Sequence, residues 1–312
     1  RRPNSSGHLL GNQAMKKSAI VTGGTRNIVP AIGTLAVNLR EICNEFADEL
    51  VVFHNGISKR QQKIINTIFP TRFIYYDNPF SDTHDFPDVV TKYFSYLVFS
   101  KYECFRLLEE YSRVTWIDYD VVITKNFQIY FDRRTESVCA IPEINLESLS
   151  DMFVPDKIGL QLPSYATLNA PGYCLSFFSL TDKFPEYMSF YKNCLKMTVL
   201  MSRFLYLPEQ CVVSVLMQNN KEQVHELPFN LFSCHPKDIT ENSSPFIIHA
   251  YSQPKFWNGL DNTLWNSYYK IWIDTYHGEK FKVDYKEAVQ KYCLKSLRRA
   301  KRFFSRIVSL GN

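Results

Sequence analysis

The chain has 312 residues, of which 45% are hydrophobic, 15% aromatic and 21% charged, and its formal net charge is +5. This composition excludes a disordered, fibrous or low-complexity protein, and the length suits one large domain or two small ones. A net charge this small is no sign of nucleic-acid binding.

Strands and helices are expected to alternate along the first part of the chain, because short apolar runs predict strands and apolar residues at three- and four-residue intervals predict helices. The predicted strands are residues 18–22, 49–54, 73–76 and 113–117, and the predicted helices are residues 28–42, 58–68 and about 90–111. This alternation indicates an α/β protein with a mainly parallel sheet flanked by helices, and ligands at the carboxyl ends of its strands. We expect one domain, since the sequence shows no linker within residues 17–260.

The start of the chain and its cysteines favour a cytosolic protein. Residues 1–14 are polar and lack the apolar centre of a signal peptide, so they are interpreted as a vector-derived leader before a native start at Met15. The sequence contains no apolar run of the ~18–20 residues that a membrane span needs. The eight cysteines are scattered without a C-x-x-C pair, which predicts mostly buried free thiols in a reducing compartment.

Two aspartates follow the strand predicted at residues 113–117. Asp118 and Asp120 are separated by one residue, and alternate residues of an extended chain point the same way, so both carboxylates can face one cation. Hard divalent metals bind carboxylate oxygens and bridge them to phosphates. Taken alone, the pair also fits a solvated turn.

A later apolar run at residues 246–249 is strand-like and places a histidine at its end. This run ends at His249, and a turn, Lys255 and Trp257 come next. In the functional interpretation His249 binds a metal ion and Lys255 binds a phosphate. The alternative is a core histidine beside an aromatic cluster.

Six segments in a fixed order resemble family 8 of the glycosyltransferases, which includes bacterial lipopolysaccharide α-galactosyl- and α-glucosyltransferases, glycogenin and galactinol synthase. They are the opening strand and Gly-Gly turn at residues 18–24, Phe99-Ser100-Lys101 for the family's Tyr-x-Arg step, residues 107–120 for its D-x-D strand, residues 168–172 for its Asn-Ala-Gly step, Pro208-Glu209-Gln210 for its D-Q-D step, and residues 249–257 for its H-x-x-G-x-x-K-P-W stretch. The departures include Thr25 and Ile28, which stand where the family has the Asp and Tyr that contact uracil. The donor sugar is therefore left open.

The resemblance implies a GT-A fold, of the Rossmann-like nucleotide-diphospho-sugar transferase type, over residues 15–260, with residues 261–312 as a C-terminal helical extension. It implies a retaining hexosyltransferase that uses Mn²⁺ (or Mg²⁺) and a UDP-sugar to form an α-linked product. Asp118, Asp120 and His249 would bind the metal, and Gln210 and Glu143 are the catalytic candidates. The residues implied for the donor are Thr22, Gly23, Gly24, Thr25, Asn27, Lys101, Asp118, Tyr119, Asn169, Ala170 and Lys255.

The last residues combine an apolar stripe with positive charge. Apolar residues recur at three- and four-residue intervals from Leu294 to Leu310, and residues 291–306 hold seven Lys and Arg residues without an acid. This pattern predicts a helix over residues 285–310 that lies on an anionic membrane surface, although a helix packed on the domain is the alternative. We therefore expect a cytoplasmic protein, peripheral on the inner face of the membrane, that extends a lipid-linked saccharide such as lipopolysaccharide or lipooligosaccharide and binds no nucleic acid.

Two other functions remain open from the sequence. One is a degenerate GT-A domain that binds a nucleotide or glycan without turnover. The other is a nucleotidyltransferase or nucleotide-sugar pyrophosphorylase, which would need a richer glycine loop with basic residues than Gly23-Gly24-Thr25-Arg26 supplies.

Overall fold

A computed structural model describes residues 17–80, 85–131 and 136–276 of the chain. Within these residues, a central sheet has the strand order β3-β2-β1-β4-β7-β6-β8. The neighbours β3, β2, β1 and β4 are parallel, β7 is antiparallel to both β4 and β6, and β6 is parallel to β8. The strands are β1 (Lys17–Gly24), β2 (Glu49–His54), β3 (Thr71–Tyr75), β4 (Tyr111–Ile117), β6 (Val138–Pro142), β7 (Tyr173–Thr181) and β8 (Val224–Glu226). The predicted mainly parallel sheet is confirmed.

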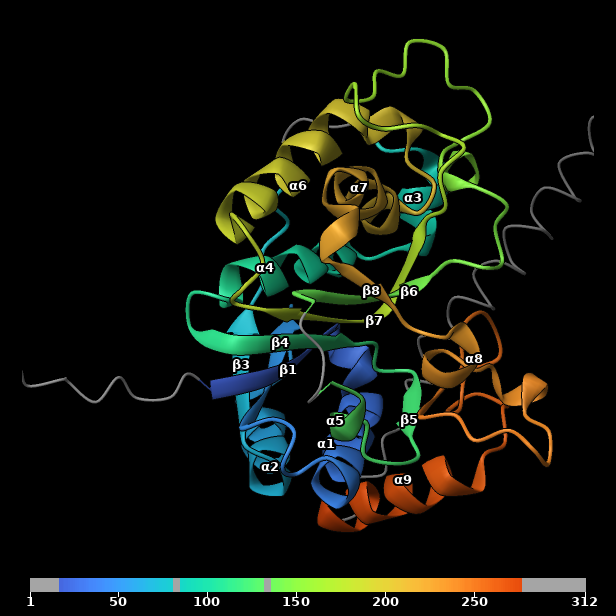
Figure 1. Ribbon diagram of the computed structural model, residues 1–312. Helices are drawn as coiled ribbons and strands as arrows, with labels where there is room; N and C mark the ends of the chain where they lie inside the picture. The colour runs from blue at the N-terminus through green and yellow to red at the C-terminus, as the bar shows by residue number, and fades with distance from the viewer. Residues whose placement is uncertain (1–16, 81–84, 132–135, 277–312) are drawn as a thin grey trace, which may run out of the picture.

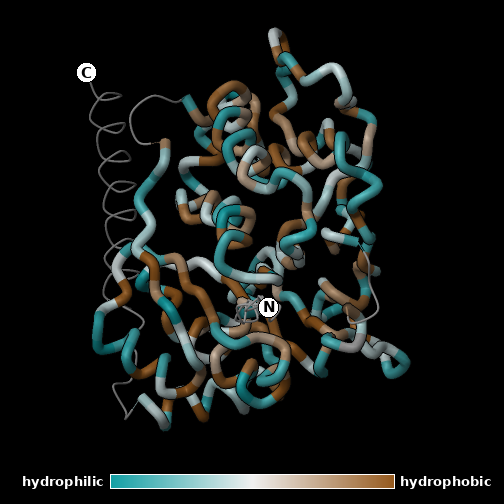
Figure 2. Tube along the Cα trace, turned by 60° about the vertical axis from the view of Figure 1, so that its left-hand side comes forward, coloured by the Kyte–Doolittle hydropathy of each residue, from teal (hydrophilic) through white to brown (hydrophobic). Residues whose placement is uncertain are grey.

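Helices cover both faces of this sheet (Figure 1). On one face lie α1 (Val29–Ile42), α2 (Lys59–Ile68), α5 (Gln128–Phe131) and α9 (Thr263–Thr275), and on the other lie α4 (Glu103–Leu107), α6 (Tyr187–Met201) and α7 (Pro208–Met217). Neighbouring strand residues alternate between two hydrophobic clusters, as Val21 and Ile20 do in β1, and Trp116 and Ile117 in β4. Figure 2 shows these apolar stretches running through the middle of the molecule. The sheet is buried on both faces, which explains its nearly continuous apolar sequence.

The predicted elements of the first half are largely confirmed at their expected places. Helix α2 begins one residue after Ser58, whose hydroxyl accepts the backbone N–H of Gln61 while the Gln61 side chain accepts the N–H of Ser58. This reciprocal pair satisfies two donors that the helix itself leaves unpaired. Helix α1 follows a short 3₁₀ turn, Arg26–Ile28.

The single helix predicted at about residues 90–111 is wrong. The segment forms α3 (Asp88–Tyr93), a 3₁₀ helix (Tyr96–Tyr102) and α4, and β4 already begins at Tyr111. The break lies at Phe94, which is extended, and at Ser95, whose side chain accepts the N–H of Leu97 and starts a new helix. Consecutive residues 99–102 are all buried, so this segment packs on several sides rather than along one helical stripe.

A second, two-stranded sheet pairs β5 (Val121–Ile123) with β9 (Ile247–His249) in antiparallel register. Val121 lies opposite His249, and β9 confirms the strand predicted to end at that histidine. The short helix α8 (Phe229–Phe232) packs beside β9. This small sheet joins chain segments that are far apart in the sequence.

Helix α9 packs across α1 where α1 has a glycine. A Cβ atom at Gly33 would lie 2.3 Å from Cδ2 of Trp272, and the Trp272 side chain is completely buried. None of the described helices is long and apolar enough to cross a membrane. The leader at residues 1–14 and the basic helix predicted at residues 285–310 lie outside the described residues.

The cysteines of the described residues agree with the sequence expectation. All seven are buried and unbridged: Cys43, Cys104, Cys139, Cys174, Cys194, Cys211 and Cys234. Cys293 lies outside the described residues.

Candidate active site

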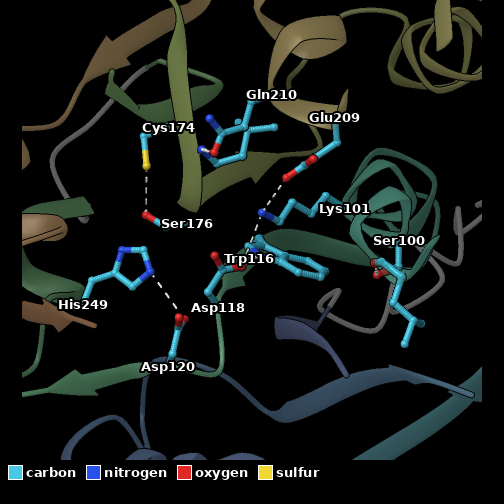
Figure 3. Close-up of polar contacts among 12 residues, drawn as sticks. Ser100, Lys101, Trp116, Asp118, Asp120, Cys174, Ser176, Glu209, Gln210 and His249 are labelled. Carbon is cyan, nitrogen blue, oxygen red and sulfur yellow. Dashed lines mark hydrogen bonds and ion pairs between the residues drawn. The ribbon is translucent and has the colours of Figure 1, made fainter. Parts of the chain in front are cut away.

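Asp118, Asp120 and His249 converge at the carboxyl end of β4 (Figure 3). One ligand atom from each residue lies within 4.8 Å of those of the other two. The backbone fixes this arrangement, because Asp118 N–H donates to the carbonyl of Ser176 (2.9 Å) and Ala250 N–H donates to the carbonyl of Asp120 (2.9 Å). Two carboxylates and one imidazole this close together form a donor set that fits a divalent cation.

The carboxylate of Asp120 is held by two basic groups. Its Oδ1 lies 3.4 Å from Nε2 of His249, and its Oδ2 accepts from Nζ of Lys255 at 2.5 Å. Nζ of Lys255 also donates to the carbonyl of Ala250 at 2.7 Å. Burial raises the pKa of Asp120, but His249 and Lys255 outweigh it and hold this pKa well below its usual range. Asp120 is therefore firmly ionised.

The carboxylate of Asp118 faces a buried ammonium on the other side. Nζ of Lys101 lies 3.4 Å from Oδ1 of Asp118 and donates to Oε1 of Glu209 at 2.9 Å. Burial lowers the pKa of Lys101, but Asp118 and Glu209 together raise it above its ordinary value. Burial raises the pKa of Asp118, in opposition to Lys101. The indole of Trp116 donates to the same Oδ1 atom of Asp118 at 2.7 Å.

These groups line a cavity of about 520 Å³. It is bordered by the end of β1, the turn after β4, the start of α7 and the segment after β9. Pro208 is the first residue of α7, and the next two residues of this helix, Glu209 and Gln210, line the cavity. The ammonium groups of Lys101 and Lys255 in one cavity suit a negatively charged ligand.

Most of the residues implied for the site lie together in the wall of this cavity. They are Gly23, Gly24, Thr25, Lys101, Asp118, Tyr119, Asp120, Glu143, Gln210, His249 and Lys255. Gln210 contacts the neighbouring strand β7 by accepting from the N–H of Leu175 at 3.4 Å, and Glu143 accepts the backbone N–H of Asn145 at 2.8 Å. The structure thus gathers the metal, phosphate and catalytic candidates at one place.

Four of the implied donor residues are not in the cavity wall. Thr22 is completely buried, and its hydroxyl has no hydrogen-bond partner. Successive residues of a strand point to opposite faces of the sheet. Gly23, not Thr22, therefore faces Ser100 and Trp116 on the side of the cavity. Asn27 and Asn169 are exposed. Ala170 is buried, and its carbonyl accepts the N–H of Leu149 rather than facing the cavity.

Several cavity residues were given no role by sequence reasoning. Glu209 precedes the candidate Gln210, yet its partner Lys101 is 108 residues earlier, so the ion pair cannot be seen in the sequence. Trp116 belongs to the strand before the two aspartates, and its place in the sequence suggests no role beyond that strand. Ser176 and Tyr251 also line the cavity. Ser176 lies in no segment that suggested chemistry, whereas Tyr251 lies within the stretch at residues 249–257 but was given no role.

Comparisons with known proteins confirm the resemblance found in the sequence. Residues 19–150 match the model of glycosyl transferase family 8. That match includes Lys101 and the two aspartates, whereas His249 lies beyond it. No curated protein sequence is significantly similar to the chain.

Solved structures of glycosyltransferases share the fold. An active-site variant of LgtC aligns with a TM-score of 0.59 and 14% identity over 82% of this chain and 94% of that one. GlyE of Streptococcus pneumoniae TIGR4 aligns with a TM-score of 0.54 and 15% identity over 83% of this chain and 62% of GlyE. The bifunctional glycosyltransferase WbbM gives a TM-score of 0.58 and 14% identity over 89% of this chain, which spans about half (52%) of WbbM. The fold is therefore of the GT-A type, in agreement with the family match over residues 19–150.

Proposed function

We propose that the chain is a metal-dependent, retaining glycosyltransferase that moves a hexose from a UDP-sugar to a saccharide acceptor. The observation that carries the proposal is the Asp118–Asp120–His249 cluster in the wall of a cavity that also holds Lys101 and Lys255. One structure with this fold is the galactosyltransferase LgtC in complex with donor and acceptor sugar analogues, at a TM-score of 0.54. A donor and an acceptor sugar are accordingly proposed for this cavity.

The residues of the cluster would hold a divalent cation, Mn²⁺ or Mg²⁺, through carboxylate and imidazole atoms. A bound divalent cation stabilises the charge that develops on a departing diphosphate. Lys255 lies next to Asp120 and is placed to pair with the same phosphates. Thr25 and Ile28, in the turn that follows β1, border the part of the cavity proposed for the base.

The sugar is proposed to lie between Lys101, Glu143 and Gln210. Lys101 is fixed by Glu209 and Asp118, so its ammonium would be held in place beside the proposed sugar. A fixed charge of this kind stabilises a transition state without reorganisation. The amide of Gln210 is a poor nucleophile, which suits direct transfer to the acceptor hydroxyl on the same face of the sugar.

The proposal includes a cellular setting. The acceptor would be a lipid-linked saccharide such as lipopolysaccharide or lipooligosaccharide, and the enzyme would work in the cytoplasm on the inner face of the membrane. The seven basic residues between 291 and 306 support this setting, because each adds roughly 1 kcal/mol of attraction to an anionic surface.

Two measurements test the proposed reaction. The first is thermal unfolding of the full chain with a panel of nucleotide sugars, with and without Mn²⁺, since a ligand that binds only the folded state raises its stability. We expect UDP-sugars to raise the melting temperature only when Mn²⁺ is present. The second is the anomeric proton coupling of the purified product, which should show an α-linkage from an α-configured donor. A β-linked product would refute retention, and stabilisation without any product would favour the degenerate GT-A domain.

A further inference from the structure

The imidazole of His249 is held by a buried serine on the side away from the cluster. Oγ of Ser233 lies 2.9 Å from Nδ1 of His249, and Ser233 is completely buried. Nε2, the other ring nitrogen, lies 3.4 Å from Oδ1 of Asp120. One ring nitrogen thus faces the cluster and the other faces Ser233.

Backbone hydrogen bonds fix Ser233 relative to His249. Ser233 follows α8 directly, and its N–H donates to the carbonyl of Phe229 at 2.8 Å. The backbone carbonyl of the next residue, Cys234, accepts the N–H of His249 at 2.8 Å. The backbone N–H of Cys234 donates to the carbonyl of Ile247 at 3.2 Å. The serine hydroxyl and the imidazole therefore meet at a position set by the main chain and not by rotamer choice alone.

The hydroxyl of Ser233 has a second partner for its own hydrogen. Its Oγ lies 3.3 Å from Oγ of Ser176, which in turn lies 3.2 Å from Sγ of Cys174 in the cavity wall. Burial raises the pKa of the Cys174 thiol to about 11, so this hydrogen-bonded row ends on a neutral group. If Nδ1–H of His249 donates to Ser233, each group can donate to the next one. Ser233 then donates to Ser176, and Ser176 donates to Cys174.

We infer that Ser233 is a positioning residue that fixes the tautomer and the orientation of His249. By accepting a hydrogen bond from Nδ1–H, it leaves the lone pair of Nε2 directed at the cation site beside Asp118 and Asp120. Partners of this kind orient metal-binding imidazoles and raise their basicity. The inference rests on the proposed function, because it presumes that His249 binds a divalent cation.

The experiment measures Mn²⁺ binding to the full chain by the electron paramagnetic resonance signal of free Mn²⁺, so no turnover is needed. Loss of the partner in Ser233→Ala should weaken Mn²⁺ binding by about 10- to 100-fold, and Ser233→Thr should restore most of it because it keeps the hydroxyl. Ser179→Ala is the matched control, since Ser179 is also buried and bonds Thr115 at 2.9 Å but lies outside the cavity wall. Its Mn²⁺ affinity should stay at the wild-type value.

Wild-type affinity in a folded Ser233→Ala protein would overturn the role of Ser233. Wild-type protein that binds no Mn²⁺ would instead overturn the metal site of the proposed function. A second measurement needs no variant: ¹⁵N NMR of the His249 ring with Mg²⁺ added reports which nitrogen carries the hydrogen. Protonated Nδ1 supports the inference, and protonated Nε2 contradicts it.

Discussion

Lys255 and a divalent cation would compete for the carboxylate of Asp120, whose Oδ2 accepts a hydrogen bond from the Lys255 ammonium. The ammonium group also donates to the carbonyl of Ala250, so in this position it is held by two acceptors at once. A cation coordinated by Asp120 would displace the ammonium, which would then be available to the phosphates of a donor. Lys255 is thus expected to oppose cation binding and to favour diphosphate binding.

The variant Lys255→Met separates these two effects. Without UDP, we expect the variant to bind Mn²⁺ up to about tenfold more tightly, because a competing positive charge is removed. In the presence of Mn²⁺, we expect it to bind UDP at least tenfold more weakly. Each factor of ten in affinity equals about 1.4 kcal/mol. Titration calorimetry measures both. Lys125→Met removes the same charge from a lysine that bonds Ser244 outside the cavity wall, and should change neither affinity. Weaker Mn²⁺ binding by Lys255→Met would contradict the competition.

Sequence reasoning at the residue scale succeeded where neighbours in the chain act together. Asp118 and Asp120 stand two residues apart at the end of an apolar strand, a spacing that fits a shared cation or a solvated turn. The structure brings both carboxylates together with His249, with the three ligand atoms within 4.8 Å of one another. Glu209 and Ser233 were missed because each acts through a partner from a distant segment, Lys101 and His249 respectively. Nothing in the local sequence of a buried glutamate or serine reveals such a partner.

Elements with one clear periodicity were predicted well, and elements that pack on several sides were not. Strand β1 and helix α2 carry regular apolar patterns and were found at their expected places. The segment from α3 to α4 is buried around its whole circumference at residues 99–102, which hides the helical period and the break at Phe94 and Ser95. The pairing of β5 with β9 joins two segments that are far apart in the sequence, so a local sequence pattern could not reveal it.

The crossing of α1 and α9 gives a prediction at this scale. Alanine in a helix interior is normally up to about 1 kcal/mol more favourable than glycine. At Gly33 the added methyl would lie 2.3–2.6 Å from three atoms of the Trp272 ring, so overpacking should win and Gly33→Ala should lower the free energy of unfolding by about 1–3 kcal/mol. Urea denaturation measures the change.

A double variant provides the control for this crossing. Trp272→Phe removes part of the indole ring, so Gly33→Ala should be less damaging in that background than in the wild type. An equal penalty in both backgrounds, or a more stable Gly33→Ala protein, would show that α9 does not pack on α1 through Trp272.

On the scale of the whole molecule, the sheet determines where the site lies. Strands β1 and β4 are adjacent and parallel, so their carboxyl ends open at one edge, and β7 brings Ser176 to the same place. The alternation of strands and helices was enough to predict this edge as the ligand site. The antiparallel insertion of β7 between β4 and β6 was not predicted, because residues 173–181 were not assigned a strand from the sequence.

The proposed membrane association is tested by removing residues 291–312. We expect the truncated chain to lose binding to anionic liposomes in a flotation assay, because the seven basic residues are lost, and to keep turnover on a soluble acceptor. Neutral liposomes serve as the control and should bind neither form. Equal binding of both forms to anionic liposomes would leave the basic segment without a role at the membrane.

Release of UDP from a UDP-sugar, measured with Mn²⁺ and again with EDTA, tests the account most directly. We predict UDP release that depends on Mn²⁺, stops in EDTA, and falls by at least about a hundredfold in Asp120→Asn, as expected for loss of a group that stabilises charge in the transition state. Asp151→Asn is the control. It removes the same charge from a side chain that accepts the backbone N–H groups of residues 147 and 148 and lies outside the cavity wall, so the rate should not change. Undiminished UDP release in EDTA, or in the Asp120→Asn variant, would contradict a metal-dependent transfer reaction at the Asp118–Asp120–His249 cluster.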